Sequence, residues 1–167
     1  WEDPRHVSPD TGYPGDNDPL DVCEIGLRGI KTGAIRAVKV LGVLVAVGVE
    51  GFARLARVPQ AMIDDGETDW KVVVIDAEDR WAPELDDIDD VERLLPGTVS
   101  LIREWFRTYK VPDGKPPNEF ALGEECMGAA CAWGVVRDCH SAYRGLLESG
   151  CGELHLPADP AALKGLD

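Results

Sequence analysis

The sequence contains no apolar run of about 18 residues, so it offers no segment that could span a bilayer as a helix. It also has few basic residues, since 17 Lys and Arg stand against 31 Asp and Glu and give a formal net charge of -14. Nucleic acids are bound through a surplus of Lys and Arg, which this chain lacks. We therefore expect no membrane segment and no nucleic-acid partner.

The cysteines show no C-x-x-C spacing, and there are five of them, an odd number. This pattern predicts neither a disulfide framework nor a zinc site, and it favours a reducing compartment. The chain opens at Trp1 without a methionine, and W-E-D-P-R is unlike a signal or transit peptide. We expect a fragment that lacks its true start, from the cytoplasm, or from a chloroplast or mitochondrion if a transit peptide preceded Trp1.

What the sequence does contain is sufficient for one domain with its own core, because 167 residues are too few for two comfortable ones. The β-branched runs at 34–44 and 70–75 predict strands, and the patterns at 91–95, 98–110 and 129–148 predict helices. Strands followed by helices indicate an α+β domain with a small sheet or barrel.

The helical periodicity also predicts which side chains are buried. We expect core positions at Leu101, Ile102, Trp105, Phe106, Tyr109, Ala132, Val136, Cys139, Tyr143 and Leu146. Trp133 and His140 on the last helix are expected to be packed rather than catalytic. The many carboxylates of 76–90 are expected to be dispersed for solubility.

The most informative stretch is D-N-D-P-L-D, which packs Asp16, Asp18 and Asp21 into six residues. Three carboxylates this close repel one another unless a hard cation lies among them, and oxygen ligands suit magnesium, manganese or calcium. The alternative is a solvated acidic loop. An EF-hand is excluded because Pro19 interrupts the loop and Asp21 stands where the sharp turn needs glycine.

Two later pairs carry complementary chemistry. Asp69 and Lys71 are two apart in a predicted strand, so they share a face and either form a surface ion pair or help to hold a metal and its anion. Tyr109 and Lys110 stand at the end of a predicted helix, where they either bind phosphate oxygens or are ordinary terminal residues.

Taken together, D-N-D-P-L-D, D-G-E-T-D-W-K-V and W-F-R-T-Y-K-V-P-D-G-K-P-P-N-E-F resemble the family I soluble inorganic pyrophosphatases, most closely the eukaryotic type. The resemblance covers 1–44 and 61–150. It implies an OB-like five-stranded β-barrel flanked by helices, incomplete here, and usually a homodimer in the complete protein. The implied reaction is magnesium-dependent hydrolysis of inorganic diphosphate to two orthophosphates, with Mn²⁺ as an alternative ion.

The resemblance also assigns roles to particular residues. Asp18 matches the carboxylate that accepts a proton from the attacking water. The matches to metal ligands are Asp16, Asp21, Asp64 and Asp69, and the matches to phosphate-binding residues are Lys71, Tyr109 and Lys110. These roles agree with elementary chemistry, because an acidic site can bind a dense anion such as diphosphate only through cations.

Two departures from the family stand out. The chain lacks the family's N-terminal portion, and residues 45–60 form a predicted insertion loop, for which a retained intron is one source. The sequence therefore leaves two hypotheses: a magnesium-dependent diphosphatase, or a non-catalytic metal- and phosphate-binding fragment or inactive partner subunit.

Overall fold

The computed structural model describes residues 1–47 and 66–149, and its core is a mixed five-stranded sheet. In chain order the elements are β1 (Asp21–Glu24), β2 (Val38–Val47), β3 (Thr68–Asp76), the 3-10 helix η1 (Ala82–Glu84), α1 (Ile88–Leu94), α2 (Thr98–Thr108), η2 (Val111–Asp113), β4 (Glu119–Phe120), η3 (Leu122–Glu124), β5 (Met127–Gly128) and α3 (Ala129–Ser149). No described helix is long and apolar enough to cross a membrane.

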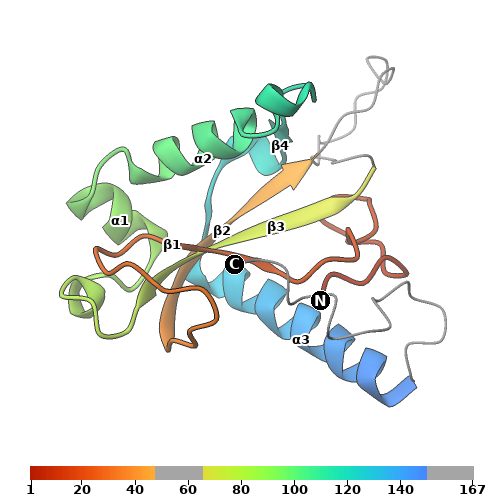
Figure 1. Ribbon diagram of the computed structural model, residues 1–167, viewed down its shortest axis with the longest axis horizontal. Coiled ribbons are helices and arrows are strands. Elements are labelled where there is room, and N and C mark those ends of the chain that lie inside the picture. Colours follow the sequence, from red (N-terminus) through yellow and green to blue (C-terminus); the bar gives the residue numbers. More distant parts are fainter. Residues whose placement is uncertain (48–65, 150–167) are drawn as a thin grey trace.

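The strand order is β1-β3-β2-β4, with β5 also paired to β2. β1 runs parallel to β3, and β2 runs antiparallel to it. In Figure 1, α1 and α2 lie on one side of the strands and α3 on the other. The expected fold, a five-stranded sheet flanked by helices that does not close into a full barrel, is confirmed for the described residues.

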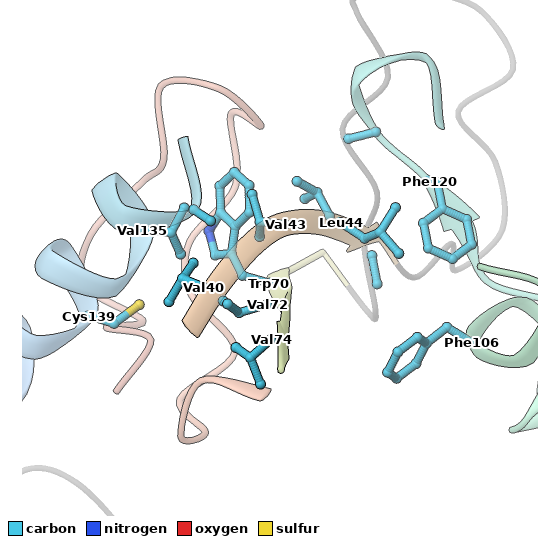
Figure 2. Packing of buried hydrophobic residues seen from close by; sticks show 14 residues of the cluster. Val40, Val43, Leu44, Trp70, Val72, Val74, Phe106, Phe120, Val135 and Cys139 are labelled. Carbon is cyan, nitrogen blue, oxygen red and sulfur yellow. The ribbon is translucent and has the colours of Figure 1, made fainter. Parts of the chain in front are cut away.

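β3 is the central strand for the site, and all nine of its residues are buried. A strand covered on both faces is typically a continuous β-branched run, as in Val72–Ile75. Trp70, Val72 and Val74 belong to a cluster that also contains residues of α2, β4 and α3. Figure 2 shows Val135 and Cys139 on one side of this cluster and Phe106 and Phe120 on the other. Val73 and Ile75 pack in a second cluster with α1.

The second strand differs from the prediction at both ends. It runs from Val38 to Val47 rather than over 34–44, because its length follows its partner: Val38 pairs with Asp76 and Val47 with Thr68. Ile35 is outside the sheet and 97% exposed. Residues 45–47 of the predicted insertion are therefore strand, while 48–60 lie outside the described residues, and the insertion stays a prediction there.

Several expectations about burial were wrong. Leu101 is 74% and Trp105 58% exposed, because β1, the edge strand beside α2, is only four residues long and leaves this side of the helix uncovered. On α3, Trp133 and Tyr143 are 48% and 45% exposed, and His140 is exposed too. Trp133 and Tyr143 extend the helix's apolar pattern beyond the face that packs on the sheet.

The acidic segment 76–90 is also more structural than expected. Asp76 and Asp79 are buried, and Asp79 accepts hydrogen bonds from the backbone N–H groups of Leu27 and Trp81, both at 2.9 Å. Asp87 caps α1 by accepting from the N–H of Ile88 at 2.7 Å and also accepts from the N–H of Ala129 at 3.2 Å. One carboxylate thus serves the N-termini of two helices.

We expect Asp87→Ala to destabilise the fold by about 1–3 kcal/mol, because a lost N-cap typically costs about 1 kcal/mol and here two helix starts lose their acceptor. Urea denaturation followed by circular dichroism would measure the change. Asp86→Ala is the matched control, since its side chain is 79% exposed and, among the described residues, makes only a surface ion pair with Lys39. Equal stability of the two variants would contradict the double-cap interpretation.

Candidate functional site

The loop that carries the first carboxylates docks onto the start of β3. The backbone N–H of Thr68 donates to the carbonyl of Pro14 at 2.6 Å, and Gly15 forms a parallel bridge with Thr68. The hydroxyls of Thr11 and Thr68 are also hydrogen-bonded to each other. These contacts place the residues after Gly15 at the edge of the sheet where β1 and β3 begin.

A local turn sets the positions of Asp16 and Asp18. The N–H of Asp18 donates to Asp16 Oδ1 at 2.9 Å, and Asn17 between them has φ 68°, a left-handed conformation that asparagine tolerates better than most residues. Trp1 Nε1 donates to Asn17 Oδ1 at 3.1 Å and supports this turn. Asp16 is half-buried and Asp18 is exposed.

The register of β1 on β3 brings Asp69 and Lys71 close to Asp21, which follows the same loop. Asp21 of β1 lies opposite Lys71 of β3, and Lys71 Nζ donates to the carboxylates of both Asp21 and Asp69. Lys71 is 2% exposed. The expectation that Asp69 and Lys71 share a face is confirmed, and the alternative of an ordinary surface ion pair is wrong, since the lysine and Asp69 are buried.

The C-terminal end of α2 packs beside Lys71. Lys71 Nζ lies 5.1 Å from the centroid of the Phe106 ring, and the Tyr109 ring centroid is 5.7 Å from that ring. Lys110 Nζ lies 5.4 Å from the Tyr109 ring centroid. Tyr109 therefore lies near the buried lysine, with Lys110 next to it, and whether the pair binds phosphate stays a prediction.

The site also contains a residue that the sequence interpretation missed, Glu2. It is 3% exposed, and carboxylate oxygens of Glu2, Asp16 and Asp69 lie within 4.8 Å of one another. No periodicity or spacing marks a single glutamate in a loop, and the only local signal is the apolar Trp1 beside it. Its position depends on a contact across 68 residues, with Trp70.

Burial and mutual repulsion raise the pKa values of this group. Burial, with Asp16 and Asp69 adding to it, raises the pKa of Glu2 to about 9. Burial also raises the pKa of Asp69 to about 6 despite the nearby Lys71, and it raises that of Asp16. The site thus holds more carboxylates than its lysine neutralises, an arrangement that a bound cation would relieve.

Burial and the same carboxylates also shift the pKa values of the basic and phenolic groups. Burial alone would lower the pKa of Lys71, but Asp69 and Asp21 outweigh it and raise it above its usual range, so the amine stays charged. Burial lowers the pKa of Lys110, with Lys115 adding to the effect. Burial, then Asp69, raises the pKa of Tyr109, so its hydroxyl remains a hydrogen-bond donor.

The structure therefore gathers most of the candidate residues. Asp16 and Asp69 meet with Glu2, Asp21 and Asp69 meet at Lys71, and the end of α2 lies beside them. Asp18 is exposed on the same loop. Asp64, the remaining predicted metal ligand, lies outside the described residues.

Comparison with known proteins gives a consistent result. The family model described as inorganic pyrophosphatase matches residues 1–51 and 59–144. The inorganic pyrophosphatases of Neurospora crassa and Schizosaccharomyces pombe are each 49% identical over 147 residues, which is 88% of this chain and 45% of theirs. The chain thus spans about half the length of the curated relatives it matches.

Solved structures agree with the sequence comparison. The inorganic pyrophosphatase of Schistosoma japonicum superimposes with a TM-score of 0.76 at 42% identity, over 87% of this chain and 46% of that one. An N-terminal domain truncated vacuolar soluble pyrophosphatase of Trypanosoma cruzi, solved in complex with PPi, gives 0.76 at 37% identity, over 89% and 50%. Both likenesses cover most of this chain and about half of the other.

Proposed function

This chain belongs to the inorganic pyrophosphatase family, and we propose that its site hydrolyses inorganic diphosphate to two orthophosphates with magnesium as cofactor. The observation that carries the proposal is the convergence of mutually repelling carboxylates, of which Glu2 and Asp69 are buried, with a buried lysine and a helix-end tyrosine and lysine. An acidic pocket beside cationic groups suits an anion that arrives with its own cations.

The donor set fits magnesium. Carboxylate oxygens are the ligands this hard cation prefers, with manganese as an alternative ion. The ligands we propose are Asp16, Asp21, Asp69 and, outside the described residues, Asp64. Bound magnesium would neutralise charge on the diphosphate and acidify a water molecule.

The side chains of this chain then supply binding and proton transfer. Asp18, exposed on the carboxylate loop, accepts the proton of the attacking water as a general base. Lys71, Tyr109 and Lys110 donate hydrogen bonds to phosphate oxygens and stabilise the charge that develops on the departing phosphate. The raised pKa of Tyr109 supports its role as a donor.

A second candidate is a non-catalytic metal- and phosphate-binding fragment, or an inactive partner subunit. The observation that favours it is the share of the relatives that the chain covers, about 45% of their length. Homodimer formation by the complete protein, and a cytoplasmic or organellar location, remain predictions for either candidate.

Phosphate release from diphosphate by the purified 167-residue chain, with Mg²⁺, with Mn²⁺ and with a chelator, decides between the two. We expect release that requires the metal and stops in chelator. A chain that is folded by circular dichroism and binds Mg²⁺ by calorimetry, yet releases no phosphate, would support the non-catalytic candidate.

A further inference from the structure

The Glu2 side chain occupies a gap in the sheet edge. Its Oε1 accepts a hydrogen bond from the backbone N–H of Trp70 at 3.1 Å, and its Oε2 lies 3.4 Å from the same nitrogen. Trp70 falls between the bridge at Thr68 and the start of the β1 ladder at Lys71. Trp70 is the residue between Asp69 and Lys71. Its N–H therefore donates to the Glu2 carboxylate, where it would otherwise donate to a carbonyl of a neighbouring strand.

The main chain of Glu2 is hydrogen-bonded to the loop that carries Asp16 and Asp18. Its N–H donates to the carbonyl of Asp18 at 2.9 Å, and its carbonyl accepts from the N–H of Asn17 at 3.0 Å. One residue therefore connects β3, through its side chain, to the turn that carries Asp16 and Asp18, through its backbone.

Gly15 gives independent evidence that this contact is close. A Cβ at this position would lie 2.6 Å from the carbonyl carbon of Glu2 and 2.9 Å from the nitrogen of Asp3. Such distances are too short for any side chain when the opposing atoms are backbone. The N–H of Gly15 also donates to the carbonyl of Asp3 at 3.2 Å, so the loop is fixed on both sides of the glycine.

We propose that Glu2 is a positioning residue, which holds Asp16 on the loop at the right distance from Asp69 on β3 for both to bind one cation. The inference rests on the proposed magnesium site. In this proposal, Mg²⁺ affinity depends on Glu2 as a hydrogen-bond acceptor rather than as a negative charge, because the accepted hydrogen bond connects Glu2 to Trp70. Partners of this kind typically change metal affinity by about 10- to 100-fold.

Two variants separate the acceptor from the charge. Glu2→Gln keeps an oxygen that can accept from Trp70 N–H but cannot ionise, whereas Glu2→Met keeps the approximate shape and has neither the acceptor nor an ionisable group. In Mg²⁺ titrations by calorimetry, we expect Glu2→Gln to bind within about threefold of the parent chain and Glu2→Met at least about tenfold more weakly. Asp16→Asn provides the reference for loss of a ligand.

Glu24→Met is the matched control for losing a half-buried carboxylate that binds backbone N–H groups elsewhere. Glu24 Oε1 also accepts from two backbone N–H groups, of Gly26 and Asp76, at the far end of β1. We expect that variant to lose stability without a change in Mg²⁺ affinity. Gly15→Ala alters the same loop contact without touching a carboxylate, and we expect it to weaken Mg²⁺ binding by a similar factor to Glu2→Met.

The outcomes are distinguishable. Mg²⁺ affinity lost equally in Glu2→Gln and Asp16→Asn would make Glu2 a ligand and overturn the proposal, as would parental affinity in Glu2→Met. If the parent chain binds no Mg²⁺, the proposed function fails on its own, and amide hydrogen exchange in the metal-free chain still tests Glu2. There we expect faster exchange at Asn17 and Trp70 in Glu2→Met than in Glu2→Gln, and equal rates would overturn it.

Discussion

Asp18→Ala is expected to lower the rate of diphosphate hydrolysis by about 10²- to 10⁴-fold, the usual range for a lost general base. The fold should not change, because the hydrogen bonds of this residue to Asp16 and Glu2 use its main-chain N–H and carbonyl. Steady-state phosphate release at saturating Mg²⁺ measures the effect. We expect the loss in kcat rather than in Mg²⁺ affinity, since Asp18 is exposed and lies outside the group formed by Glu2, Asp16 and Asp69.

Asp10→Ala provides the control, because Asp10 is an exposed aspartate of the same N-terminal segment. It should retain the parental rate. A rate for Asp18→Ala equal to that control would show that another group accepts the proton. A loss that disappears at high Mg²⁺ concentration would instead make Asp18 a metal ligand.

The parts of the site that depend on the regular alternation of side chains along a strand, or on local spacing, could be predicted from the sequence. Asp69 and Lys71 share a face because strand side chains alternate, and β3 is a continuous β-branched run because both of its faces are covered. The spacing of Asp16, Asp18 and Asp21 is likewise local, since a single turn around Asn17 positions the first two.

Glu2 could not be predicted because its role depends on tertiary contacts alone. It has no periodic neighbour, and the N–H it accepts from belongs to Trp70, 68 residues away. β4 and β5 could not be predicted for the same reason. Each has only two residues, and each forms because β2 offers a partner.

Exposure was the other source of error. The periodicity of α2 correctly marks an apolar face, but how much of it is covered depends on its neighbours. Phe106 reaches the core cluster, whereas Leu101 and Trp105 face the short edge strand and remain in solvent. A pattern in one helix contains no information on the length of the strand beside it.

Lys71→Met is expected to have the largest effect on stability. The lysine is 2% exposed and is hydrogen-bonded to Asp21 and Asp69, of which Asp69 is itself buried. Removing one partner of a buried pair leaves an uncompensated charge and costs about 3–5 kcal/mol. Urea denaturation of the metal-free chain at pH 8 measures this cost, and phosphate release should fall as well because a phosphate-binding cation is lost.

The stability lost in Lys71→Met should increase with pH. Burial already raises the pKa of Asp69 to about 6, and without Lys71 it should rise further. An acid whose pKa is higher in the folded than in the unfolded protein loses stability as the pH rises above the unfolded value. We therefore expect a smaller deficit at pH 5 than at pH 8, and partial recovery at pH 8 when Mg²⁺ is added.

Lys39→Met separates this effect from the general loss of a strand lysine. Lys39 pairs with Asp86, whose side chain is 79% exposed, so its replacement should cost about 1 kcal/mol or less. If Lys71→Met costs no more than Lys39→Met at every pH, the repulsion among the site carboxylates is relieved without the lysine. Their crowding would then no longer argue for a cation, and the main physical support for the magnesium site would be lost.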